Sequence, residues 1–115
     1  MQHEDSESPL HSTYANDEAI AEILPIFVNN MPKYLGDLEA RIQQSDWVAA
    51  ARVCHDLKGT AGGYGYPEIG RLAQVLEAEI KGDRNPAMAQ KYLQDMRTLY
   101  LRARRGLENT QMSDQ

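Results

Sequence analysis

The chain contains one cysteine, Cys54, in 115 residues, so no disulfide can form within it. A single thiol is compatible with a reducing compartment, and we expect a cytoplasmic protein. Aromatic residues make up only 7% of the sequence, whereas alanine, leucine, glutamate, glutamine and arginine are frequent. That composition favours helices over sheets. The single cysteine argues against a secreted scaffold held together by disulfides, and the low aromatic content argues against an all-β fold.

Long apolar runs and an excess of positive charge are also missing. The best apolar run, IAEILPIFV at residues 20–28, is too short to cross a bilayer and contains a glutamate. The acidic, polar N-terminus has neither the basic nor the apolar part of a signal peptide. The net charge is −5, and the basic cluster near the C-terminus suits a solvated helix end. We therefore expect neither a membrane nor a nucleic acid as a partner.

Between two polar ends, the sequence contains a series of helical patterns. Residues 1–15 show no apolar period and are predicted to be a flexible acidic tail. Residues 16–108 are predicted to form one helical bundle, and residues 109–115 a second flexible tail. The length suits a single domain, and the start at Met1 favours a free-standing protein.

Five helices are predicted. The first follows an Asn16 cap and should end or kink near Leu24, because Pro25 interrupts its pattern. The second is predicted to start near Pro32. The other three are predicted over about residues 46 to the early 60s, 67 to 80 and 86 to 107. Short connections favour antiparallel neighbours, so the predicted fold is all-α, an antiparallel four-helix bundle with a short additional N-terminal helix.

The third predicted helix carries His55, which is the one histidine outside the N-terminal tail. Five residues at alternating spacings of four and three form the apolar face of this helix: Trp47, Ala50, Cys54, Leu57 and Ala61. The helical wheel places His55 well away from that face. We therefore expect its ring to point to solvent.

A lysine and several glycines follow the histidine. Lys58 comes three residues later, Gly59 four, and Gly62 and Gly63 one turn further on. A glycine inside a helix costs about 1 kcal/mol relative to alanine, so repeated glycine suggests that something bulky must approach the ring. A neutral imidazole is a nucleophile, and a phosphoryl group on it would gain charge-assisted hydrogen bonds from Lys58.

Residues 55–65, HDLKGTAGGYG, resemble the motif of the histidine-containing phosphotransfer (HPt) domain family, roughly H-x-L/I-K-G-x-A-x-x-x-G, at every fixed position. The family continues with a leucine-bearing helix ending in Leu-Glu, here Leu76 and Glu77, and the resemblance covers about residues 17–107. It implies an intermediate of a two-component phosphorelay. In that role His55 would accept a phosphoryl group on Nε2 from a receiver-domain phosphoaspartate and pass it to the aspartate of another receiver.

The resemblance also implies roles for the neighbouring residues. Lys58 would stabilise the phosphoryl charge, and Gly59 would leave access to the imidazole. The implied partners are response-regulator receiver domains and/or a hybrid histidine kinase, with Mg²⁺ on the receiver and no cofactor or metal on this chain. Such a domain is a phosphocarrier without turnover or kinase activity of its own. The wheel, rather than the motif, adds Val48, Arg52 and Gly62 as docking residues, and we expect a monomer.

Three other interpretations share some of these residues. The dimerisation domain of a sensor kinase would need Thr or Asn four residues after the histidine and Pro five after, where this chain has Gly59 and Thr60. The phosphoacceptor domain of a chemotaxis-type histidine kinase shares the bundle and would be phosphorylated from ATP on a separate kinase domain. A non-catalytic helical adaptor would leave the glycine cost beside His55 unexplained. The sequence leaves the cognate receivers and the direction of transfer open.

Overall fold

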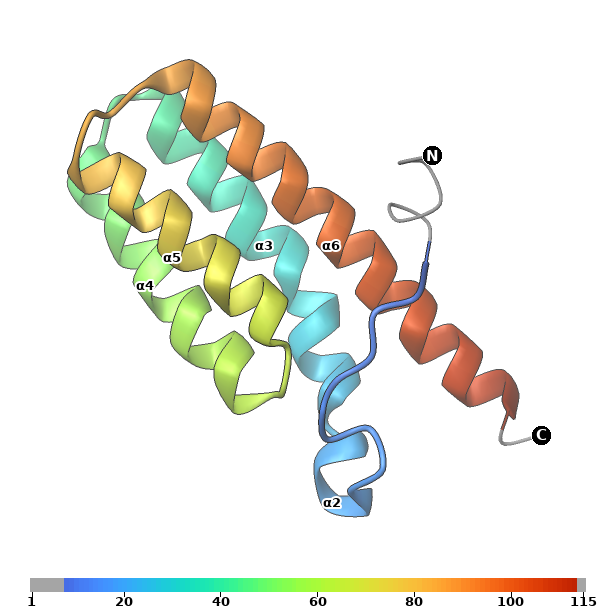
Figure 1. Ribbon diagram of the computed structural model, residues 1–115. Helices are drawn as coiled ribbons and strands as arrows, with labels where there is room; N and C mark the ends of the chain where they lie inside the picture. Colours follow the sequence, from blue (N-terminus) through green and yellow to red (C-terminus); the bar gives the residue numbers. More distant parts are fainter. Residues whose placement is uncertain (1–7, 114–115) are drawn as a thin grey trace.

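Four long helices form a bundle, with a single short turn of helix at one end (Figure 1). The computed structural model describes residues 8–113, and side chains up to residue 109. The helices are α2 (Glu18–Ala21), α3 (Leu24–Gln43), α4 (Trp47–Gly63), α5 (Pro67–Lys81) and α6 (Pro86–Ser113). Each long helix contacts the next, and α6 closes the ring against α3. The predicted fold class is confirmed.

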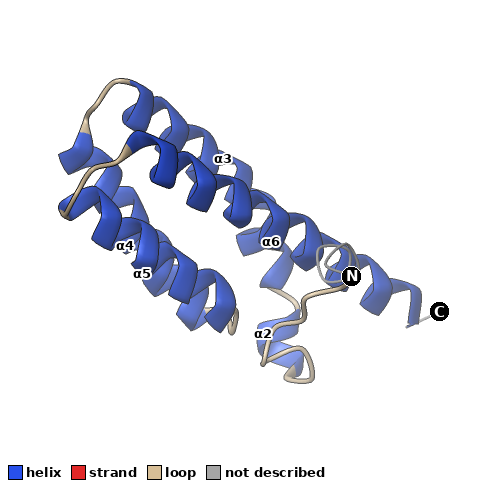
Figure 2. Ribbon diagram, turned by 45° about the horizontal axis from the view of Figure 1, so that its top comes forward, coloured by secondary structure: helices blue, strands red, loops and turns tan. Residues whose placement is uncertain are grey.

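The bundle has two layers. Figure 2 shows α4 and α5 together on one side and α3 and α6 on the other. Each helix turns a stripe of apolar residues inward, as amphipathic helices do. The largest fully buried side chains come from all four long helices and from the α4–α5 turn, namely Tyr66, Phe27, Met31, Leu38, Leu57, Ile69, Leu76, Ile80, Leu93, Met96, Val28 and Cys54. Within residues 8–113, no helix combines the length and the apolar character that crossing a membrane requires.

Two helices begin differently from the prediction. Asp17, not Asn16, caps α2, and its carboxylate accepts hydrogen bonds from the backbone N–H groups of Ala19 at 3.1 Å and Ile20 at 3.3 Å. The helix before Pro25 ends at Ala21, close to the predicted end near Leu24, and Pro25 lies in the first turn of the next helix, α3. Proline is well tolerated in that turn because its missing N–H would have no helical partner there.

The predicted helix start near Pro32 is wrong, because Pro32 lies inside α3. A proline in a helix interior costs about 3 kcal/mol, since it removes a hydrogen bond and crowds the preceding turn. The buried residues on both sides of it continue one stripe: Phe27, Val28, Met31, Leu35, Leu38 and Ile42. Burial of each large apolar side chain contributes about 1.5–3 kcal/mol. The free energy gained by burying this stripe is therefore larger than the cost of the proline.

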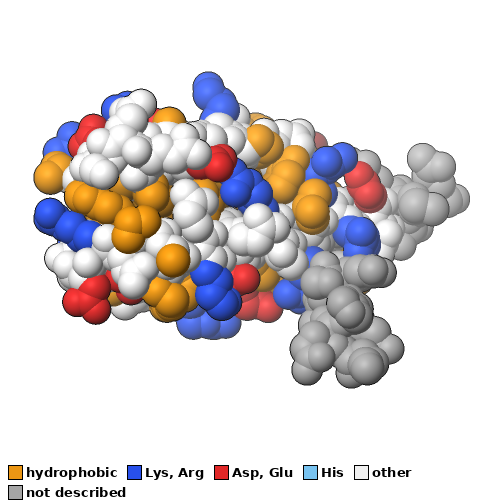
Figure 3. Space-filling view, turned by 90° about the horizontal axis from the view of Figure 1, so that it is seen from above, with side chains coloured by type: hydrophobic (Ala, Val, Ile, Leu, Met, Phe, Trp, Pro, Cys, Tyr) orange, Lys and Arg blue, Asp and Glu red, His pale blue; other side chains and the backbone are white. Residues whose placement is uncertain are grey.

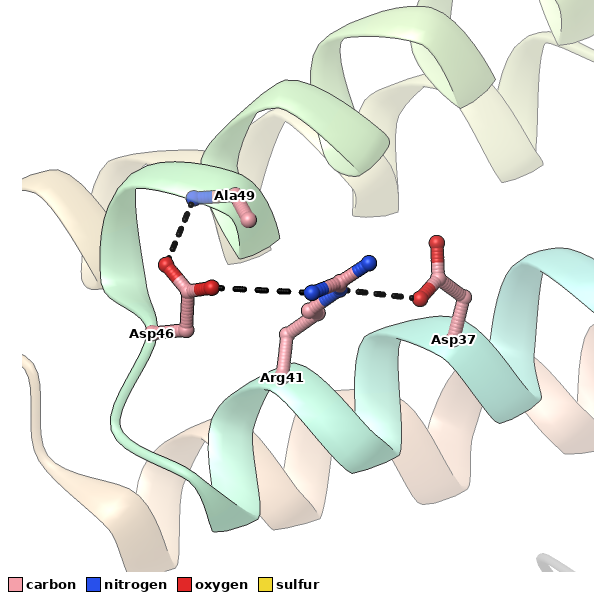
Figure 4. A network of polar contacts seen from close by, with 4 residues as sticks. All are labelled: Asp37, Arg41, Asp46 and Ala49. Carbon is pink, nitrogen blue, oxygen red and sulfur yellow. Dashed lines mark hydrogen bonds and ion pairs between the residues drawn. The ribbon is translucent and has the colours of Figure 1, made fainter.

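The start of α4 is fixed by a polar network (Figure 4). The Asp46 carboxylate accepts a hydrogen bond from the backbone N–H of Ala49 at 3.3 Å, which confirms Asp46 as one of the two predicted caps. Arg41 lies between two carboxylates, 3.6 Å from Asp46 and 3.0 Å from Asp37. A capped first turn sets where the helix begins, and with it which side chains of α4 face outward.

Residues 8–17, here called the N-terminal segment, cross one end of the bundle. The Leu10 side chain is 5% exposed. Its backbone N–H donates a hydrogen bond to the carbonyl of Arg102 on α6 at 2.9 Å. The N–H of Thr13 donates to the carbonyl of Gly65, in the α4–α5 turn, at 2.8 Å. The segment therefore ties α6 to the turn that follows α4.

Both predicted tails differ from the structure where they are described. Residues 8–15, expected to be flexible, contain the buried Leu10 and the hydrogen bonds to the bundle. Residues 109–113, expected to be a second tail, continue helix α6. The rest of the two predicted tails, residues 1–7 and 114–115, lies outside the described residues.

Candidate functional site

His55 lies in the middle of α4 with its ring at the surface. The side chain is 65% exposed, whereas Cys54 and Leu57 on either side of the position are fully buried. Successive residues of a helix are rotated by about 100°, so a helix that buries both of these residues presents His55 outward. The ring lies where the sequence predicts it.

Glu77 of α5 faces the histidine from the neighbouring helix. Its Oε2 lies 3.5 Å from Nδ1 of His55, and the side chain is 9% exposed. Among residues 8–109, no hydrogen bond or ion pair involves Nε2 of His55. A carboxylate at one ring nitrogen favours the tautomer with the proton on that nitrogen. The arrangement thus leaves the lone pair of Nε2 available.

Two lysines share the same carboxylate. Lys58 Nζ lies 3.7 Å from Oε1 of Glu77, and Lys81 Nζ lies 3.0 Å from Oε2. Burial raises the pKa of Glu77, but the hydrogen bond from Lys81 and the charges of Lys81, Lys58 and His55 outweigh burial and bring that pKa below its ordinary value. Glu77 is therefore ionised at neutral pH, and one carboxylate serves three partners.

The glycines beyond His55 on α4 border open space. A Cβ atom built at Gly59, Gly62 or Gly63 would have no neighbour within 4 Å outside the local helix backbone. The opposite side of the ring is bounded by a shallow groove of about 430 Å³. Its lining residues come from the first half of α4, the end of α5 and the loop after α5: Trp47, Val48, Ala51, Arg52, His55, Glu77, Ile80, Lys81 and Arg84.

The groove combines an apolar floor with a cationic rim. Val48 is 69% exposed and places an apolar side chain at the edge of the groove. Arg52, Lys81 and Arg84 supply positive charge around it, although the chain as a whole carries a net charge of −5. On the face seen from above, Figure 3 shows lysine and arginine side chains scattered among apolar and acidic ones.

The structure brings some of the predicted docking residues together and not others. Val48 and Arg52 line the groove next to His55, whereas Gly62 lies outside the groove, on the open side of the ring. Sequence reasoning assigned no role to Glu77 or Lys81. A signal for Glu77 was available, since it is a charged residue directly beside the apolar stripe of α5 in the Leu-Glu pair.

The comparisons with known proteins agree with this geometry. The family model described as "Hpt domain" matches residues 22–106, which is well over half of the chain. The chain therefore belongs to the Hpt domain family, whose members carry out phosphotransfer in two-component signalling and interact with receiver domains and kinases. The resemblance of the sequence motif is thereby confirmed.

One curated protein matches part of the chain. It is described as "Putative D-3-phosphoglycerate dehydrogenase" of Schizosaccharomyces pombe (strain 972 / ATCC 24843) and is 30% identical over 73 residues. The match covers 63% of this chain but only 16% of that protein, so the chain corresponds to less than a fifth of its length. No solved structure matches the chain significantly.

Proposed function

We propose that His55 is the phosphoacceptor of this chain. In this proposal it takes a phosphoryl group from the phosphoaspartate of one receiver domain and passes it to the aspartate of another. The observation that carries the proposal is the ring itself, 65% exposed, with Nδ1 facing the buried Glu77 and Nε2 open. A histidine held in this way is a positioned nucleophile rather than a core residue.

The transfer onto His55 is a displacement at phosphorus. The lone pair of Nε2 attacks the phosphorus in line, a P–N bond forms, and the P–O bond to the aspartate breaks with its electron pair going to the aspartate carboxylate. The proton on Nδ1 stays in place, so the ring becomes a phosphorylated imidazolium. The Glu77 carboxylate, 3.5 Å from Nδ1, stabilises the positive charge that develops there.

Lys58 and Gly59 have separate roles in this proposal. Lys58 is on α4 one turn after His55, and its Nζ is held 3.7 Å from Oε1 of Glu77. From there it would stabilise the negative charge of the phosphoryl group. Gly59 leaves the space beside the ring empty, which lets a folded partner bring its aspartate close to Nε2.

The docking face is proposed to be the outward side of α4. Val48 and Arg52 supply apolar and cationic contacts on one side of His55, and Gly62 supplies a flat approach on the other. The cationic rim of the groove suits the acidic surface around a receiver's phosphorylated aspartate. Mg²⁺ would belong to the receiver, and no cofactor is proposed on this chain.

The first test is transfer of a radiolabelled phosphoryl group from phosphorylated receivers of the same source. We expect label on the chain that is acid-labile and alkali-stable. We expect it to be lost in His55→Gln and retained in the matched control His11→Gln, since His11 is an exposed histidine of the N-terminal segment. Chelation of Mg²⁺ should stop transfer between the proteins without removing label already on the chain.

Other outcomes separate the competing functions. If label appears only with ATP and a chemotaxis-type kinase domain, the donor is a kinase and not a receiver. His55 would still be the acceptor. A folded, helical chain that no receiver and no kinase labels would refute the proposal and favour a helical adaptor. Label that survives in His55→Gln would place the acceptor on a different residue.

A further inference from the structure

Lys81 and His55 face the same oxygen atom of Glu77. Oε2 lies 3.0 Å from Lys81 Nζ and 3.5 Å from His55 Nδ1, whereas Lys58 approaches the other oxygen, Oε1, at 3.7 Å. Lys81 lies one turn after Glu77 on α5, at the spacing that brings side chains together. The negative charge that would stabilise a proton on Nδ1 is therefore divided between the ring and Lys81.

We propose that Lys81 sets the lifetime of the phosphohistidine by drawing the charge of Glu77 away from Nδ1. The inference rests on the proposed phosphorylation of His55 and adds a positioning residue to it. Lys81 acts through Glu77 and need not touch the phosphoryl group. Its side chain is 65% exposed, so the ion pair is free to break when a docked partner or the new phosphoryl charge changes its surroundings.

The chemistry explains why the charge on Glu77 controls the lifetime. When the P–N bond breaks, its electron pair returns to Nε2, and the ring leaves as neutral imidazole only if Nδ1 carries a proton. Without that proton the leaving group would be an imidazolate anion, which is a much poorer one. In hydrolysis, water attacks the phosphorus and gives its proton to the phosphate product, while the proton on Nδ1 is retained. At alkaline pH, where most phosphohistidine lacks the proton on Nδ1, a stronger negative charge next to this nitrogen raises the protonated fraction, which is the form that breaks down. The stronger charge thus shortens the lifetime under these conditions, and Lys81 weakens that charge.

Lys58 is expected to act differently. It belongs to α4, the helix of His55, and contacts the oxygen of Glu77 that does not face the ring. Its removal takes a cation away from the phosphoryl group as well as from Glu77, so the two effects are mixed. Lys81 approaches from α5 on the Nδ1 side of the ring. Its removal therefore changes the charge on Glu77 without taking a cation away from the phosphoryl group.

The experiment measures loss of phosphate from the full chain at alkaline pH, after phosphorylation by phosphoramidate, a small donor that releases ammonia when its own P–N bond breaks. In Lys81→Met we expect the phosphohistidine to decay about two- to fivefold faster, the size that an exposed ion pair supports. The matched control is Lys91→Met. Lys91 is 62% exposed and pairs with Asp95 four residues later at 2.9 Å, but it lies on α6. This control should decay at the wild-type rate.

A double-mutant cycle tests whether the effect passes through Glu77. In a Glu77→Gln background, Lys81→Met should no longer change the decay rate. An equal effect in both backgrounds would overturn the inference, because Lys81 would then act directly on the phosphoryl group. An unchanged or slower decay in the single variant would overturn it as well.

A second readout needs no phosphate. Ring ¹⁵N chemical shifts of His55 in the unphosphorylated chain report which nitrogen carries the proton. Lys81→Met should increase the fraction of the tautomer protonated on Nδ1, and Lys91→Met should not. A chain that phosphoramidate labels but receivers do not would refute the proposed receiver partnership alone. Unchanged ring shifts in Lys81→Met would refute the role of Lys81, even if the relay works.

Discussion

Two groups of glycines in this molecule serve opposite purposes. Gly59, Gly62 and Gly63 lie beside His55, and a Cβ atom at any of them would meet nothing within 4 Å. Gly65 and Gly106 lie under the N-terminal segment. A Cβ at Gly65 would come within 2.5 Å of Ser12 Oγ, and a Cβ at Gly106 would overlap the carbonyl of Leu10. The space that glycine leaves is empty at one site and filled by the chain at the other.

The difference separates fold from function. Gly65 and Gly106 define what we call the closed end. There the N-terminal segment packs directly against the backbone, which leaves no room for a side chain at either position. Beside His55 no described residue uses the space, so it is available to a partner. One open glycine, Gly36 on α3, lies away from the histidine. Openness alone therefore does not define a docking face, and Gly36 provides the control for the variants below.

The largest effect is expected at the closed end. Gly65 has a φ of +82°, a left-handed conformation that costs other residues about 1–2 kcal/mol. The overlap with Ser12 adds about 1–3 kcal/mol, so Gly65→Ala should lower the free energy of unfolding by about 2–5 kcal/mol in urea titrations. Gly36→Ala should instead raise it by about 0.5–1 kcal/mol. Wild-type stability in Gly65→Ala would mean that the N-terminal segment does not pack there.

A smaller effect, on transfer and not on folding, is expected at the open site. A helical side chain leans toward the N-terminal turn, so the leucine of Gly59→Leu would cover the ring of His55. We expect receiver-dependent phosphorylation to slow by about tenfold or more, which corresponds to about 1.4 kcal/mol, with stability unchanged or slightly raised. Gly36→Leu should transfer normally. Equal rates in both variants would remove Gly59 from the docking face.

The two regions also differ in how their contributions to stability depend on pH. Burial raises the pKa of Tyr66, in the α4–α5 turn, from 10.0 to about 12. A buried neutral phenol stabilises the fold below its unfolded pKa, and this contribution is lost as the pH rises from about 10 to 12. The pKa of Glu77 is lowered from 4.5, so its contribution is present above pH 4.5 and is lost as the pH falls below that value.

Urea titrations at a series of pH values give the free energy of unfolding as a function of pH and check both the acid limb and the alkaline limb of that curve. Tyr66→Phe should flatten part of the alkaline loss of stability and leave the acid limb unchanged. Burial, followed by the charge of Glu77, also raises the pKa of the Cys54 thiol to about 12, so Cys54 contributes to the alkaline loss as well. Glu77→Gln should flatten the acid limb. A variant that changed the opposite limb would contradict these assignments.

The bundle could be predicted from the sequence because its signals are local. The apolar stripes, the Asp46 cap and the start of α5 at Pro67 each depend on residues within one or two turns. The outward direction of His55 follows from the same periodicity. The local prediction is wrong at Pro32. A proline normally ends a helix, but here the buried apolar stripe continues for several turns on both sides of Pro32, and α3 continues with it.

The remaining features depend on contacts between residues far apart in the chain. Leu10 has no periodic neighbours, and its burial depends on α6, with its N–H bonded to the carbonyl of Arg102. Glu77 could be seen as a charged residue beside an apolar stripe, but not as the partner of His55. That contact comes from the packing of α4 against α5, which no spacing within one helix specifies.

The groove beside His55 also contains a natural optical probe. Trp47, which is half-buried, lines it, and it is the one tryptophan of the whole chain. Indole fluorescence depends on solvent access and on nearby charge, so a partner that covers the groove should change the emission of this single fluorophore. Binding at this face can therefore be followed in unlabelled protein, with either a receiver or a kinase domain free of tryptophan.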